Sequence, residues 1–130
     1  MDKASKEFHN ANVEECLRWL STYVDSDTRS TLLERLVWEE DKLGRDKEQL
    51  ELTALRRRDY EVRISRLLSV MSGLKQLGLM DGEHLSRAEV VLATMRETFR
   101  LLEQCHSCIY DELHQLGSSW DWRYSEAEHA

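Results

Sequence analysis

The cysteines and histidines near the C-terminal end are the residues with the clearest potential for chemistry. Cys105 and Cys108 form a Cys-x-x-Cys pair, His106 lies between them, and His114 follows two helical turns later. Zinc takes about four nitrogen or sulfur ligands in a tetrahedron, and a spacing of three residues can present two of them from one helix. The second Cys-x-x-Cys or histidine pair of a zinc module is missing. We therefore predict neither a metal nor a cofactor. A metal- or thiol-dependent role centred on these four residues is kept as the alternative to the leading functional prediction, a protein–protein interaction module.

Two other reactions that this segment suggests lack their partners. A carboxylate-bridged di-iron bundle needs Glu-x-x-His on two helices, and only Glu103 with His106 has that spacing. A thioredoxin-type redox pair needs its first cysteine at a helix N-terminus, whereas Cys105 is expected in the middle of a helix. The sequence also contains no glycine-rich phosphate loop and no nucleophile elbow. We predict that the protein is not an enzyme.

The consecutive arginines Arg56, Arg57 and Arg58, with Arg63 and Arg66 beyond them, form the only basic cluster. Successive helical residues point about 100° apart, so three arginines in a row do not form one flat patch. The chain as a whole has a net charge of −7, which opposes the phosphate contacts that dominate non-specific nucleic-acid binding. We expect these arginines to pair with the acidic last helix or with an acidic partner. A nucleic-acid-associated role through this cluster is the weakest alternative.

A second apolar face is predicted in the same segment. Leu52, Leu55 and Val62 lie on the side opposite to its main apolar stripe, and that stripe is weak at Thr53 and Arg57. An apolar face with no obvious partner in the chain implies either another packed element or a contact with another molecule. We therefore hypothesise that residues 46–62 meet another chain, which burial of Leu52 and Leu55 inside the fold would contradict.

The C-terminal tail, residues 118–130, carries a second set of candidate contacts. Trp120, Trp122 and Tyr124 alternate with polar residues, so an extended segment would have one fully aromatic edge. Tryptophan and tyrosine are enriched among the residues that dominate binding energies. The tail either binds a partner or folds back over the end of the fold, and the sequence does not distinguish the two.

The strongest structural signal is an apolar stripe along the last helix, whose positions step by three and four residues. Flanking residues at 91, 98 and 105 widen the stripe, which is typical of a helix in a bundle and broader than the seam of a two-stranded coiled coil. The stripe consists of Leu85, Ala88, Leu92, Met95, Phe99, Leu102, His106, Ile109, Leu113 and Leu116.

The remaining segments supply the other layers of the fold. A first helix is predicted from Asn12, a second begins after the turn at 25–27, and a third carries a stripe from residue 50 to 74. Gly44 either separates the second and third helices or lies within one helix that runs from 27 to 77. The fold class is therefore an all-α antiparallel helical bundle, with three long layers of which the first is broken, or with four helices. Residues 1–117 are predicted to form a single domain.

Composition limits the setting of the protein. There is no proline, glycine occurs five times, and no apolar run reaches the roughly 18–20 residues that span a bilayer. Three cysteines and an N-terminus without a signal sequence favour a cytoplasmic or nuclear protein with free thiols. The leading functional prediction is a protein–protein interaction module: an adaptor, a scaffold subunit or a self-associating assembly domain. Its expected partner is a protein or a second copy of the chain, without membrane or nucleic acid.

Overall fold

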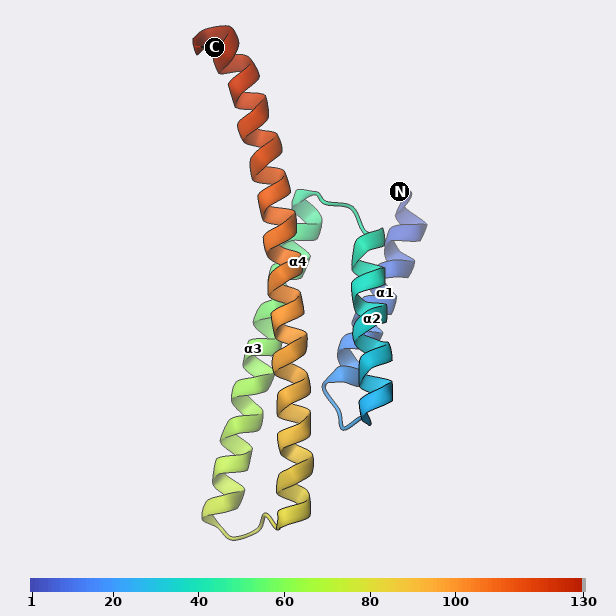
Figure 1. Ribbon diagram of the computed structural model, residues 1–130, viewed down its shortest axis with the longest axis vertical. Helices are drawn as coiled ribbons and strands as arrows, with labels where there is room; N and C mark the ends of the chain where they lie inside the picture. Colours follow the sequence, from blue (N-terminus) through green and yellow to red (C-terminus); the bar gives the residue numbers. More distant parts are fainter. Residues whose placement is uncertain (130) are drawn as a thin grey trace.

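The computed structural model describes residues 1–129, and the side chains of residues 1–114. The described chain forms four helices and no strand: α1 (Lys3–Leu20), α2 (Ser26–Lys42), α3 (Lys47–Gln76) and α4 (Gly82–His129). Helices α1 and α2 form one antiparallel hairpin, α3 and α4 form a longer one, and the two hairpins pack side by side (Figure 1). The predicted all-α bundle is confirmed in its four-helix form, because α1 and α2 lie beside each other and do not continue one another as a broken layer.

An aspartate immediately precedes the first turn of each helix. Asp2, Asp25, Asp46 and Asp81 each accept a hydrogen bond from a backbone N–H three residues later, at 2.7 to 2.9 Å. These bonds satisfy N–H groups that the first turn of a helix leaves without partners. Of the two alternatives at Gly44, the structure has the break: Gly44 lies between α2 and α3 and not within one helix from 27 to 77. The predicted start of the first helix at Asn12 is wrong, because α1 begins at Lys3 with Asp2 as its cap.

Gly78, just after the end of α3, has the only positive φ angle among the described residues, 67°. The N–H of Leu79 donates to the carbonyl of Leu74 at 2.9 Å, which closes a Schellman ending on α3. A left-handed residue at this point reverses the chain direction with very few residues. The turn therefore places α3 and α4 side by side along their lengths.

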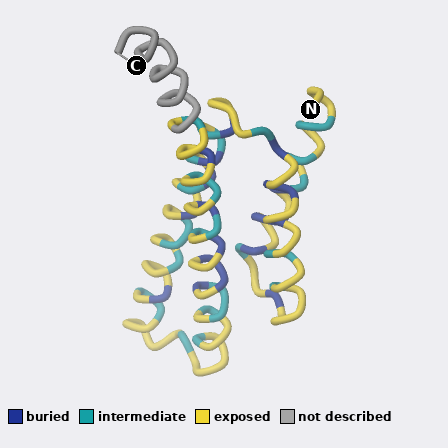
Figure 2. The backbone as a smooth tube through the Cα atoms, turned by 45° about the horizontal axis from the view of Figure 1, so that its top comes forward, coloured by how far each residue is buried: buried dark blue, intermediate teal, exposed yellow. Residues whose placement is uncertain are grey.

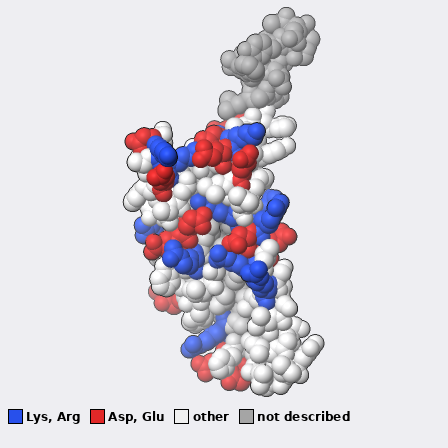
Figure 3. Space-filling view, turned by 180° about the vertical axis from the view of Figure 1, so that it is seen from behind, with Lys and Arg blue, Asp and Glu red and all other residues white. Residues whose placement is uncertain are grey.

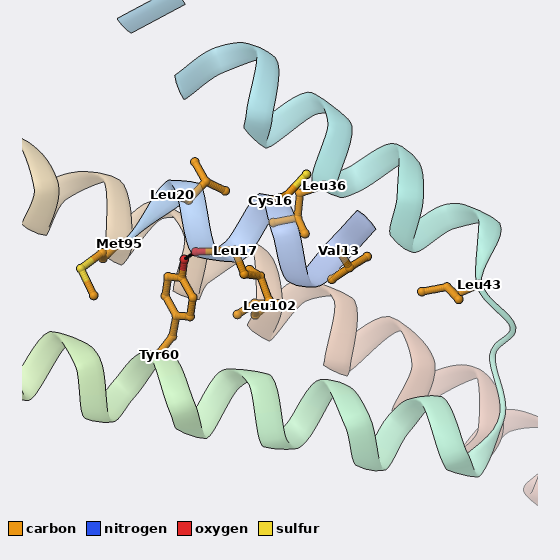
Figure 4. Close-up of a cluster of buried hydrophobic side chains, with 9 residues drawn as sticks. All are labelled: Val13, Cys16, Leu17, Leu20, Leu36, Leu43, Tyr60, Met95 and Leu102. Atoms are coloured by element: carbon orange, nitrogen blue, oxygen red, sulfur yellow. Dashed lines mark hydrogen bonds between the residues drawn. The ribbon is translucent and has the colours of Figure 1, made fainter. Parts of the chain in front are cut away.

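The core lies where the two hairpins face each other. On α4 the predicted stripe is confirmed between residues 92 and 109, since Leu92, Met95, Leu102 and Ile109 are all buried, whereas its last member, Leu116, lies outside the described side chains. Figure 4 shows Tyr60 of α3 entering this core, with its hydroxyl donating to the backbone carbonyl of Leu17 in α1. The buried cluster consists of Val13, Cys16, Leu17, Leu20, Leu36, Leu43, Tyr60, Met95 and Leu102.

The α1/α2 hairpin is shorter than the α3/α4 hairpin and covers only the half that lies away from the α3–α4 turn (Figure 1). Figure 2 shows that residues near that turn are mostly exposed or half-buried. The fold thus leaves one end of a long helical hairpin without a covering layer.

Among the described residues, no helix combines the length and the apolar character needed to cross a bilayer.

Candidate protein-interaction surface

Arg56, predicted as a contact residue, lies inside the fold. It is 5% exposed, and its guanidinium reaches Oε1 of Glu14 in α1 at 2.7 Å and Oε1 of Glu40 in α2 at 3.3 Å. It also donates to the side-chain oxygen of Asn10 at 2.9 Å. A buried guanidinium is tolerated only when its donors meet charged or polar acceptors. Arg56 therefore joins α3 to the α1/α2 hairpin.

One acceptor of this junction, Glu40, is itself buried. Burial raises the pKa of Glu40 above its ordinary value, although the neighbouring charge of Arg56 acts in the opposite direction. The neighbouring Glu39 is also buried. Its Oε1 accepts a hydrogen bond from the side-chain amide of Asn12 at 3.1 Å, and its Oε2 lies 2.7 Å from Nδ1 of His9. The polar N-terminal half of α1 thus packs against polar, buried residues of α2, and this contact involves no apolar stripe.

This junction corrects two expectations. The cluster was expected to pair with the last helix or an outside acid, but Arg56 pairs with acids of the first two helices. Thr53, read as a weak core position that indicated an outside partner, is fully buried beside this junction. Only part of the cluster remains available for contacts, since Arg57 is half-buried and Arg58 is exposed.

The second apolar face of α3 remains uncovered. Leu55 is 60% exposed and Val62 is 41% exposed, while Leu52 is half-buried. At about 100° per residue, two further side chains fall on the same side of the helix, namely Val70, 56% exposed, and Leu77, 71% exposed. We define the outer face of α3 as the strip, about 80° wide, formed by Leu52, Leu55, Asp59, Val62, Arg66, Val70, Gly73 and Leu77.

Val70 and Leu77 were not among the contact residues predicted from the sequence. Spacings of seven and eight residues separate Leu55, Val62, Val70 and Leu77, and these spacings bring residues back to nearly the same side of a helix. This spacing can be seen in the sequence, and it extends the predicted contact region beyond residue 62, to the end of α3.

A groove runs along one edge of the outer face. It has a volume of about 190 Å³, and Glu14 and Leu17 of α1 form one wall while Leu52, Leu55 and Asp59 of α3 belong to the other. Its surface also includes Arg56, which pairs with Glu14, and Arg63, which pairs with Asp59. The groove therefore offers apolar contact through its leucine side chains, next to ion pairs of opposite charges.

Cys105 and Cys108 of α4 line one cavity, but neither His106 nor His114 belongs to its lining. Cys105 lines this cavity of about 160 Å³ with Glu40, and burial followed by that carboxylate's charge raises the thiol pKa to about 12. Cys108 is exposed, while the ring of His106 stacks on Tyr110, which stacks in turn on His114. The described residues contain no group of three His, Cys, Asp or Glu side chains placed to hold a metal ion. A raised thiol pKa also disfavours the reactive thiolate.

One remaining prediction concerns the aromatic residues of the C-terminal tail. Trp120, Trp122 and Tyr124 lie outside the side chains that the structure describes, so their role stays a prediction. In the two N-terminal helices, Trp19 and Trp38 are both 54% exposed. Lys42 packs over the ring of Trp38, with its ammonium nitrogen 4.9 Å from the ring centroid, so part of that surface is covered by the chain itself.

Comparison with known proteins adds no function to this description. No protein-family model matches the chain, and no curated protein or solved structure is significantly similar to it.

Proposed function

We propose that this chain is a non-catalytic protein–protein interaction module that binds through the outer face of α3. The fold presents this helix as a rigid binding element, because α4 packs along one side of it and the Arg56 junction anchors it to α1 and α2. An adaptor, a scaffold subunit or an assembly domain needs a surface of this kind.

The observation that carries the proposal is the exposure of four large aliphatic side chains on one strip of one helix. Leu55, Val62, Val70 and Leu77 are each at least 41% exposed. Single exposed apolar residues are ordinary, but an apolar strip along about 33 Å of helix, at 1.5 Å per residue, is typical of a binding site. Helix-in-groove recognition uses side chains at such spacings.

The direct test is site-specific photo-crosslinking of the full chain in living cells. A photo-reactive amino acid replaces Leu55 in one variant (Leu55→p-benzoylphenylalanine) and Glu97, an exposed residue of α4, in a matched control. We expect a discrete adduct from position 55, identified by mass spectrometry as another polypeptide or a second copy, and none from position 97. Adding Val62→Glu should remove the adduct.

Two results would contradict the proposal. Position 55 could give no adduct, or both positions could give the same mixture of adducts. Either result would mean that the outer face of α3 is not selectively bound.

A further inference from the structure

The residues of the outer face of α3 form a pattern that is complementary to itself when reversed. Along the helix its first seven positions are apolar, apolar, acidic, apolar, basic, apolar and small: Leu52, Leu55, Asp59, Val62, Arg66, Val70 and Gly73. The steps between them are three, four, three, four, four and three residues. An axis between residues 62 and 63 therefore relates each position to one at the other end.

We infer that the outer face of α3 binds the same face of a second copy of this chain, with the two α3 helices antiparallel. The inference rests on the proposed function, because it names the partner of the same surface. In this arrangement a residue of one copy faces the residue of the second copy for which the two residue numbers add up to about 125. Leu55 then meets Val70 of the second copy, Val62 lies at the axis, and Leu52 meets Gly73, which leaves room for its larger side chain.

Charge selects the antiparallel direction. Reversal places Asp59 opposite Arg66 twice, once on each side of the axis, whereas a parallel pair would place each of them opposite its own kind. Arg66 is exposed and has no acidic partner in its own chain among the described residues. Asp59 contacts Arg63 at 2.9 Å, but its side chain is 56% exposed. Its second oxygen is therefore free to meet another guanidinium.

The shape of the molecule suits this arrangement. The half of α3 that carries Val70 belongs to the end of the α3/α4 hairpin that α1 and α2 leave uncovered (Figure 1). Residues 64–80 contain only two charged side chains, Arg66 and Lys75, and Figure 3 shows a mostly uncharged surface at this end of the molecule. In the proposed dimer this slender end lies against the α1–α3 groove beside Leu55 of the other copy.

The size of the surface indicates a weak, reversible dimer. The matched segment, residues 52–73, is about 33 Å long and one helix wide, about 10 Å, which gives a contact strip of about 330 Å². Standard interfaces bury about 800 Å² on each partner, so the helix pair alone lies below the standard range, where weak and transient contacts fall. We therefore expect a dimer Kd in the micromolar range and an average molar mass that rises with protein concentration.

The test is sedimentation equilibrium of the full chain with charge-exchanged variants. Asp59→Arg and Arg66→Asp each place like charges opposite one another on both sides of the axis, so each should raise the dimer Kd at least about 10-fold. The double variant, Asp59→Arg with Arg66→Asp, restores both pairs and should return the Kd to within a few-fold of the original. Glu61→Arg is the matched control because Glu61 points away from the outer face, and it should leave the Kd unchanged.

Each outcome decides the inference. Weakening by both single exchanges together with recovery in the double variant supports the antiparallel dimer. A wild-type chain that stays at the monomer mass of 15.4 kDa at millimolar concentration overturns it, as does a double variant no better than the singles. A monomer whose position 55 still crosslinks to a different protein would refute the dimer and support the proposed function, whereas a monomer without adducts would refute both.

Discussion

Replacement of Arg56 tests whether this arginine is a structural junction or a surface contact. In Arg56→Met, Glu40 loses the guanidinium 3.3 Å away while its own side chain stays 5% exposed. Glu14 also loses its partner, but its side chain is 55% exposed and water can replace the arginine. The main loss in the variant is therefore the ion-pair partner of one buried carboxylate, to which Arg45 contributes only a weaker attraction.

Breaking a buried ion pair by removing one partner typically lowers the free energy of unfolding by about 3–5 kcal/mol. For a chain of this length, about 1 kcal/mol corresponds to roughly 3–5 °C in Tm, so we expect Tm to fall by about 10–20 °C. Domains of this size are stable by about 5–15 kcal/mol, so the loss is a large fraction of the total. The double variant Arg56→Met with Glu40→Met replaces both charges by apolar groups and should recover most of it.

Acid should reduce the deficit of the single variant. The pKa of Glu40 is already raised by burial, and removal of Arg56 raises it further. A carboxyl group with a raised pKa in the folded state binds its proton more tightly there than in the unfolded chain, so stability increases as the pH falls through that pKa. Urea unfolding followed by circular dichroism at about pH 7 and about pH 5 measures both effects.

Arg58→Met is the matched control because Arg58 is exposed two residues along the same helix, and its unfolding free energy should change by less than about 0.5 kcal/mol. Equal, small losses in Arg56→Met and Arg58→Met would refute the buried junction. A double variant as unstable as Arg56→Met would show that the lost stability does not come from an uncompensated Glu40.

Three further substitutions probe the scaffold, each followed by urea or thermal unfolding of dilute protein. Gly73→Ala and Gly78→Ala both add a methyl group into open space, but only Gly78 has a positive φ, 67°. Gly73→Ala should therefore stabilise the protein by about 0.5–1 kcal/mol, and Gly78→Ala should destabilise it by about 1 kcal/mol. Equal effects would contradict the left-handed conformation of Gly78. Asp46→Asn keeps the cap but loses the charge. Because the hydrogen bond from the Gln49 backbone lowers the pKa of Asp46, the wild-type protein should be more stable than the variant by its full margin above about pH 4, and this margin should vanish as the pH falls through that lowered pKa. A difference in stability that stays constant across acid pH would exclude the charge as its source. His106→Leu should keep stability equal or raise it, because burial lowers the pKa of His106 and its neutral ring occupies a half-buried position of the α4 stripe; a loss above about 1 kcal/mol would mean that the imidazole makes a required contact.

The elements that depend on apolar periodicity were predictable. The stripe of α4 and the helix starts after Asp25 and Asp46 follow from local rules of spacing and capping, which act within a few residues of the chain. The exposed position of Leu55 also agrees with its place opposite the main stripe of α3. These predictions required no knowledge of which helices meet.

The polar junction was not predictable by the same reasoning. Helix α1 extends to Lys3 through a polar segment whose packing partners are buried acids of α2, and hydrophobic periodicity does not detect such contacts. On α3, Thr53 and Tyr60 are separated by seven residues, and a step of three or four reaches Arg56 or Arg57 equally well. The pattern cannot choose between them, because the choice depends on where Glu14 and Glu40 come to lie.

Hydroxyl-radical footprinting across protein concentration tests the central claim most directly, since it reports the exposure of individual side chains in solution. Leu55, which is 60% exposed, and Leu20, which is fully buried, are chemically identical probes on the outer face of α3 and in the core. We expect strong oxidation of Leu55 and almost none of Leu20 in dilute protein, followed by protection of Leu55 as the concentration rises. Weak labelling of Leu55 at every dilution, equal to that of Leu20, would contradict the account because it would mean that the outer face is covered within the chain itself.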